Sequence, residues 1–173
     1  MNNNIQNYTD IGFKKIKAPK KSFEMLQKFW NANHKENEKV ELWGPANVYT
    51  NHWAAPTYMV DASSHRYPHG GGSLTWEVER ETKNILENWT LEKLERTSLY
   101  GIRVYKEGAV LSPHVDRNPL IISAIINVAQ DIDEPWPIEV IGHDGKAYNI
   151  TMEPGDMVLY ESHSVIHGEY QYL

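Results

Sequence analysis

The sequence predicts a mainly β protein, a jelly roll or barrel of two sheets with N-terminal helices packed on the outside of one sheet. Up to about residue 98 the chain is polar, rich in tryptophan and partly helical, whereas residues 99–173 contain six or more short strands. Helices that precede a run of short strands favour this architecture. The length of 173 residues fits one domain, 1–173, with its own core. Its first part, 1–98, is expected to be a helical and loop region that supports the strands.

Two helices are predicted in this support region. The first begins near Ser22, a candidate N-cap, because apolar side chains recur on one helical face after it. The second runs from about Ser73 to Trp89 with the same periodicity, and Thr90 is a candidate cap for a short further turn. Residues 39–72 hold three prolines and three consecutive glycines, so they predict loops or short edge strands.

Six strands are predicted in the second part, and turn residues mark their connections. Asp144-Gly145 lies between two apolar runs, which is a strong hairpin signal. Pro154-Gly155-Asp156 predicts another turn. The run at 120–128 is apolar almost throughout, as in a strand covered on both faces. The predicted strands are 99–105, 109–116, 120–128, 136–142, 146–152 and 157–160.

Composition restricts the chemistry of any site. The chain has no cysteine, which excludes disulfides, zinc–thiolate sites, iron–sulfur clusters and a cysteine nucleophile. A metal must therefore be held by histidine and carboxylate. The net charge of -6 argues against nucleic acid as a partner. No apolar run is long enough to span a bilayer, and the first residues lack the pattern of a signal peptide. We expect a cytoplasmic protein with neither nucleic acid nor a membrane as partner.

The spacing His-x-Asp/Glu can supply two metal ligands, and it occurs three times, at His34–Glu36, His114–Asp116 and His167–Glu169. About one match is expected by chance at this composition, so context must decide. The first copy falls at a polar helix end, where residues two apart point away from each other. His114 and Asp116 end a predicted strand, where residues i and i+2 share a face. They suit a 2-His-1-carboxylate site for non-haem Fe(II), although a hydrogen-bonded His–Asp pair is also compatible.

A third metal ligand has to come from elsewhere in the chain. Two histidines follow the turn at Gly155-Asp156, namely His163 and His167. His163 lies in the polar stretch 161–164, which predicts a loop. His167 follows Val165-Ile166, which can begin a new strand. Position favours His167 and leaves His163 as the alternative.

Several features of residues 99–173 occur in a fixed order. Tyr105 stands nine residues before His114, within Pro113-His114-Val115-Asp116. An apolar strand with Ser123 follows, then the hairpin, then Gly155-Asp156-Met157-Val158-Leu159-Tyr160, and finally Ile166-His167-Gly168. As an ordered set they resemble the prolyl 4-hydroxylase type of 2-oxoglutarate- and Fe(II)-dependent oxygenases. The first motif is similar to the proximal motif of that family and the last to its distal His-Gly.

The resemblance implies a double-stranded β-helix with a metal near one open end. His114, Asp116 and His167 would hold Fe(II), with 2-oxoglutarate and O2 in the remaining positions and ascorbate as an auxiliary reductant. The implied reaction hydroxylates a substrate and releases succinate and CO2. A peptidyl proline is the substrate that the resemblance implies. Because a fold does not fix a substrate, another side chain or a small molecule stays open.

The resemblance also implies donors for the far carboxylate of 2-oxoglutarate. Tyr105 and Ser123 match two of them. The third is a Lys or Arg nine or ten residues after the distal histidine, which would lie beyond Leu173 on a closing strand that the sequence also lacks. Arg103 is the internal candidate for this charge, because it shares a strand face with Tyr105. A solvent-facing strand residue is the alternative for Arg103.

Three further residues are weaker candidates. Asn127 alternates with Ser123 along the predicted strand, so its amide can face the cosubstrate or be a satisfied buried group. Arg117 and Trp136 are candidate substrate contacts at the barrel mouth, and core packing is the alternative for Trp136.

Two other functions are compatible with the same sequence. One is a non-catalytic or degenerate metal-binding jelly roll, which the missing basic residue favours. The other is a cupin-type enzyme that binds a metal but does not use 2-oxoglutarate. Dependence on the cosubstrate separates the enzyme classes.

Overall fold

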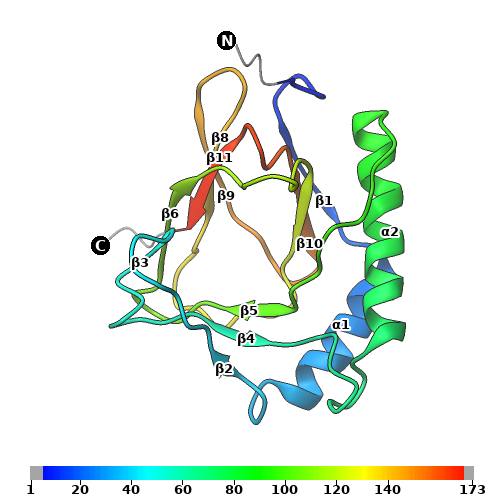
Figure 1. The fold of residues 1–173 in the computed structure, drawn as a ribbon, viewed down its shortest axis with the longest axis vertical. Helices are drawn as coiled ribbons and strands as arrows, with labels where there is room; N and C mark the ends of the chain where they lie inside the picture. The colour runs from blue at the N-terminus through cyan, green and yellow to red at the C-terminus, as the bar shows by residue number, and fades with distance from the viewer. Residues whose placement is uncertain (1–5, 170–173) are drawn as a thin grey trace.

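The computed structural model describes residues 6–169, which form two helices and eleven strands (Figure 1). The helices are α1 (Lys20–Asn33) and α2 (Gly72–Thr90). The strands are β1 (Phe13–Lys17), β2 (Lys39–Val40), β3 (Tyr49–Thr50), β4 (Tyr58–Val60), β5 (Ile102–Val104), β6 (Val110–His114), β7 (Ser123–Ile126), β8 (Ile138–Ile141), β9 (Ala147–Ile150), β10 (Asp156–Tyr160) and β11 (Ile166–Glu169). All six predicted strands are present, each shorter than expected except the one at 157–160.

The strands form three antiparallel sheets around a common interior (Figure 1). Their orders are β3-β6-β11-β8-β9, β1-β10-β7 and β2-β4-β5. Neighbouring strands are often distant in sequence, as with β6 beside β11 and β7 beside β10. Such crossed connections between two main sheets are those of a jelly roll. The predicted fold class, a double-stranded β-helix with N-terminal helices packed outside, is confirmed.

The first 98 residues contribute more than helices and loops. Strand β1 pairs with β10 over five residues, from Phe13 opposite Tyr160 to Lys17 opposite Asp156. Strands β2 and β4 pair with each other, and β3 pairs with β6. The sequence around β1 gave no strand signal because β1 lies at a sheet edge, where lysine side chains are common and apolar alternation is weak. The closing strand expected beyond Leu173 lies outside the described residues.

Both predicted helices are present, but their predicted caps are wrong. Helix α1 begins at Lys20, directly after Pro19, and the Ser22 side chain is buried with no hydrogen-bond partner among the described residues. The Thr90 hydroxyl donates back to the Leu86 carbonyl at 2.8 Å and accepts the Glu92 N–H at 3.4 Å, but there is no following helical turn for it to cap. Leu91 is left-handed and ends the helix, and no further helix follows within residues 91–98.

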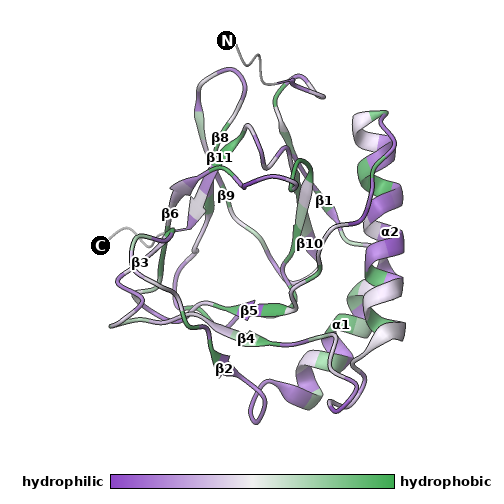
Figure 2. Cartoon of the chain, in the orientation of Figure 1, coloured by the Kyte–Doolittle hydropathy of each residue, from purple (hydrophilic) through white to green (hydrophobic). Residues whose placement is uncertain are grey.

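Apolar and polar residues are interspersed along both helices (Figure 2). Buried apolar side chains of both helices pack on the barrel. Phe29 of α1 and Leu74 of α2 share one cluster with Val60 of β4. At the other end of α2, Leu86 packs against Met157 of β10. The helices therefore cover the outside of the sheet that contains β10 and leave the interior to the strands (Figure 1). In the described chain, neither helix is long and apolar enough to cross a membrane.

A buried carboxylate ties β1 to the turn before β10. Asp156 is 2% exposed and accepts hydrogen bonds from Lys15 at 2.9 Å, Lys17 at 2.5 Å and the Glu153 N–H at 2.9 Å. The ammonium of Lys15, followed by that of Lys17, holds the pKa of Asp156 far below its usual range. This lowered pKa stabilises the fold above the unfolded-state pKa of about 3.9, and the stabilisation is lost as the pH falls below it.

Asp156→Asn is therefore expected to lower the free energy of unfolding by about 2 kcal/mol at pH 7. The cost should shrink as the pH falls below about 4, because the carboxyl of the unfolded wild-type chain takes up a proton there while the native carboxylate stays charged. Urea unfolding, followed by circular dichroism at pH 7 and below pH 4, measures the change in the free energy of unfolding. A cost that stays the same at both pH values would contradict the assigned role of the carboxylate charge.

Candidate metal centre

Three side chains converge where β6 and β11 lie side by side. His114 is the last residue of β6 and lies directly opposite His167 of β11. Asp116 follows β6 by two residues. One ligand atom from each side chain lies within 4.8 Å of the other two. The Asp116 carboxylate is 3.7 Å from His114 Nε2 and 3.9 Å from His167 Nε2. Asp116 lies near His114 because only one residue separates them in the chain, whereas the β6–β11 pairing supplies His167.

Backbone carbonyls hold both imidazoles in the same way. His114 Nδ1 lies 2.8 Å from the Ser112 carbonyl, and His167 Nδ1 lies 2.9 Å from the Val165 carbonyl. A carbonyl oxygen can only accept, so each Nδ1 carries a proton and each Nε2 presents a lone pair toward Asp116. A histidine that ligates a metal through Nε2 commonly donates its Nδ1–H in this way. Both rings are thus oriented as metal ligands.

The surroundings of His167 favour its neutral form. The residue is 5% exposed, and the Tyr160 ring packs at 4.6 Å between centroids. Burial, followed by the charge of the adjacent His114, lowers the pKa of His167. A neutral imidazole is the form that binds a metal. The Asp116 N–H donates to the Ser162 carbonyl at 2.7 Å, so the loop after β10 also fixes the carboxylate.

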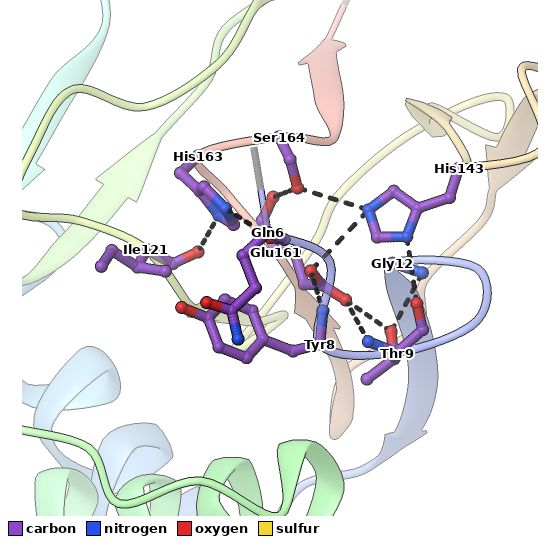
Figure 3. Close-up of polar contacts among 9 residues, drawn as sticks. All are labelled: Gln6, Tyr8, Thr9, Gly12, Ile121, His143, Glu161, His163 and Ser164. Carbon is purple, nitrogen blue, oxygen red and sulfur yellow. Dashed lines mark hydrogen bonds and ion pairs between the residues drawn. The ribbon is translucent and has the colours of Figure 1, made fainter. Parts of the chain in front are cut away.

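The alternative ligand His163 is used elsewhere. Its Nδ1 lies 3.0 Å from the Ile121 carbonyl and its Nε2 lies 3.0 Å from the Gln6 carbonyl (Figure 3). Tyr8 packs edge-on against the same ring. Both nitrogens are therefore engaged with backbone carbonyls, and the side chain fastens the N-terminal segment. The structure brings His167 to Asp116, and not His163.

The two hydroxyl residues expected around a cosubstrate lie on different walls of the barrel. Ser123 begins β7 opposite Tyr160, and its hydroxyl lies 2.8 Å from that of Ser162. Tyr105 follows β5, with its ring 6.5 Å from Tyr49. Burial raises the pKa of Tyr105 well above its ordinary value, so its hydroxyl remains a hydrogen-bond donor.

Arg103 is engaged by a carboxylate that the sequence did not point to. Its Nε lies 2.7 Å from Glu41 Oε2, and its Nη2 lies 3.0 Å from Glu41 Oε1. The guanidinium also stacks over the Tyr49 ring at 5.3 Å from its centroid. Arg103 is thus not the solvent-facing residue of the alternative interpretation. It is also not a free cation, because Glu41 compensates its charge. No sequence signal indicated Glu41, which is 62 residues away.

The remaining candidates are Asn127, Arg117 and Trp136. The amide of Asn127 donates to Gln130 at 2.8 Å and lies 3.3 Å from the Met152 carbonyl, contacts that fasten a loop rather than face the metal residues. Arg117 is exposed, one residue past Asp116. Trp136 lies against Tyr105, with ring centroids 6.2 Å apart. Its buried Nε1 has no hydrogen-bond partner among the described residues.

Glu169 was not among the predicted site residues, and the sequence marked it only as part of a His-x-Asp/Glu match. It is the acid of the third His-x-Asp/Glu copy, and it lies on the same face of β11 as His167. Burial raises the pKa of its carboxyl to about 7, against the opposing effects of Arg103 and the Tyr105 hydroxyl. Strand alternation beyond His167 is the signal that could have identified it.

The donor set fits Fe(II). Two imidazoles and one carboxylate make up the 2-His-1-carboxylate donor set that suits non-haem Fe(II).

Comparison with known proteins supports the fold. No protein-family model and no curated protein matches the sequence. The structure is similar to the crystal structure of a prolyl-4-hydroxylase from Pseudomonas putida, with a TM-score of 0.60 over 92% of this chain and 84% of that chain. The sequence identity of 12% makes this a likeness of fold. The resemblance inferred from residues 99–173 is thereby confirmed at the level of structure, and the chain has a prolyl-4-hydroxylase-like jelly-roll fold.

Proposed function

We propose that this protein, as one oxygenase domain over residues 1–173, is an Fe(II)- and 2-oxoglutarate-dependent dioxygenase. It hydroxylates a substrate and releases succinate and CO2. The observation that carries this proposal is the convergence of His114, Asp116 and His167 inside a prolyl-4-hydroxylase-like fold. A triad that holds Fe(II) on one side leaves room for a chelating 2-oxo acid and O2 on the other.

Each residue of the site has a defined task in this proposal. His114 and His167 present Nε2 to the metal because carbonyls hold their Nδ1–H groups. Asp116 supplies the anionic ligand. Bound Fe(II) supplies the oxygen chemistry, and the barrel orients the reactants and excludes water. Tyr105 and Ser123 are the proposed donors to 2-oxoglutarate.

We propose a peptidyl prolyl residue as the substrate, which follows the named activity of the similar structure. Arg117, exposed beside Asp116, is suited to contact a peptide backbone or acidic group at the mouth. Trp136 supplies an aromatic wall next to Tyr105. If the substrate is instead a different side chain or a small molecule, prolyl peptides will not stimulate turnover in the succinate assay described below.

A second candidate function is a metal-binding jelly roll without catalysis. The pairing of Arg103 with Glu41 favours it, because this pairing reduces the net positive charge available to an acidic cosubstrate. This alternative predicts iron binding without turnover.

The test is succinate formation from 2-oxoglutarate in air with Fe(II) and ascorbate, with and without a proline-rich peptide. We expect slow succinate formation alone and faster formation with the peptide. Asp116→Ala should lower both rates at least about 100-fold, because an incomplete triad cannot retain the metal. Iron binding by the wild type with no succinate under either condition would contradict the oxygenase proposal and support the non-catalytic alternative.

A further inference from the structure

We propose that Glu161 is a positioning residue of the metal centre, which keeps Asp116 and His167 in place through the loop between β10 and β11. This loop consists of residues 161–165. Its first residue holds it against the N-terminal segment, residues 6–12 (Figure 3). The inference rests on the proposed function, because the loop supports residues of the same metal centre.

The loop contacts the metal centre through its backbone and one hydroxyl group. The Ser162 carbonyl accepts the Asp116 N–H at 2.7 Å, and the Ser162 hydroxyl lies 2.8 Å from that of Ser123. The Val165 carbonyl accepts the Nδ1–H of His167 at 2.9 Å. Ser162 and Val165 are both completely buried. Two of the three metal residues therefore take their orientation from this loop, because each donates a hydrogen bond to its backbone.

The Glu161 side chain joins the loop to the N-terminal segment. Its fully buried carboxylate accepts the Tyr8 N–H at 2.9 Å and the N–H and hydroxyl of Thr9 at 2.8 and 2.6 Å. The Glu161 N–H donates to the Gly12 carbonyl at 2.8 Å, and the Glu161 carbonyl accepts the Val165 N–H at 2.8 Å. Glu161 thus fixes both ends of the loop, because each of these donors would lose its acceptor if the loop moved.

The N-terminal segment is packed directly on the loop. Gly12 has a φ of +85°, and a Cβ there would overlap Val165 Cγ2 and lie 2.7 Å from His143 Nε2. His143 contacts both parts, with Nδ1 3.1 Å from the Thr9 carbonyl and Nε2 3.3 Å from the Ser164 hydroxyl. Because the packing at these positions is close, a displacement of the segment also displaces the loop.

A second buried carboxylate provides a matched control for stability. Asp156 is the first residue of β10, and Glu161 directly follows the last one. Asp156 holds β1 through the ammonium groups of Lys15 and Lys17. Both carboxylates therefore fasten the beginning of the chain to β10, but at opposite ends of the strand. The loop that contacts the metal residues lies at the Glu161 end, so loss of the Asp156 anchor should leave those residues in place.

The first test measures amide hydrogen exchange at Asp116 in the metal-free protein by two-dimensional NMR. We expect Glu161→Gln to raise this exchange rate at least about tenfold, because the acceptor on Ser162 is no longer fixed. Asp156→Asn lowers the stability of the whole fold at a distance from the loop. It should leave the exchange rate of Asp116 within about threefold of wild type.

The second test measures Mn(II) affinity by calorimetric titration. Glu161→Gln should bind Mn(II) about tenfold more weakly than wild type, and Asp156→Asn should stay within about threefold. Thr9→Val removes the hydroxyl that donates to Glu161 and accepts the Gly12 N–H at 3.1 Å, so it should weaken binding as well. Thr9→Ser keeps this hydroxyl and should match wild type. The Thr9 variants keep the test decisive if Glu161→Gln does not fold.

Unchanged Asp116 exchange and Mn(II) affinity in the folded Glu161→Gln and Thr9→Val proteins would overturn the positioning role. Equal changes in Asp156→Asn would also overturn it, because loss of stability alone would then explain them. Failure of the wild type to bind Mn(II) would overturn the metal centre and this role together. Mn(II) binding with the expected differences, but no succinate formation with Fe(II), would contradict only the proposed dioxygenase function.

Discussion

Asp116→Ala is expected to lower the affinity for Fe(II) by at least about 100-fold. Loss of an outer-shell partner alone commonly costs 10–100-fold, and Asp116 is the only anionic member of the triad. Without it, two imidazoles with ring centroids 4.4 Å apart remain as the whole site. Anaerobic titration with Fe(II), followed by competition with a chelator of known affinity, measures the loss.

His167→Ala should behave like Asp116→Ala, while His163→Ala provides the matched control. His163 is the neighbouring histidine whose two nitrogens face the Ile121 and Gln6 carbonyls. We expect its replacement to keep the Fe(II) affinity within about threefold of wild type. The opposite pattern, with His163→Ala losing iron and His167→Ala keeping it, would show that the distal ligand is misassigned.

Glu161→Ala is expected to lower the free energy of unfolding by about 3–5 kcal/mol. The Glu161 carboxylate is fully buried between β10 and β11 and holds the N-terminal segment (Figure 3). It accepts from the Tyr8 N–H at 2.9 Å, the Thr9 N–H at 2.8 Å and the Thr9 hydroxyl at 2.6 Å. His143 Nε2 lies 3.7 Å away. Truncation leaves these partly buried donors without their acceptor.

Urea unfolding measures this cost, with Glu107→Gln as an exposed control that should stay within about 0.5 kcal/mol of wild type. The next residue, Ser162, accepts the Asp116 N–H, so the same segment connects the N-terminal anchor to the metal centre. A cost for Glu161→Ala no larger than that of the control would contradict the anchoring role.

Local patterns in the sequence were sufficient for several elements of this fold. Asp144-Gly145 specifies the β8–β9 hairpin because both strands and the turn are contiguous in the chain. The periodic apolar residues predicted both helices. Alternation along one strand placed His114 and Asp116 on one face, and the order of motifs selected His167. Each of these inferences uses residues that are close in sequence or arranged in a recognisable order.

Contacts between distant segments were not predictable in the same way. Strand β1 pairs with β10 across more than 130 residues and is rich in lysine, so it carries no apolar pattern. Glu41 reaches Arg103 from a region of prolines and glycines that predicted loops. Glu169 carried a signal that spacing alone did not distinguish from chance. Its position in the structure depends on the pairing of β11 with β8 and β6.

The central claim, that His114, Asp116 and His167 hold one iron, is tested most directly by anomalous diffraction from crystals grown anaerobically with Fe(II). Data collected on both sides of the iron absorption edge locate iron independently of any assumption about its ligands. We expect one peak per chain, between the two His Nε2 atoms and the Asp116 carboxylate. A peak elsewhere, or no peak in crystals that contain stoichiometric iron, would contradict the assignment.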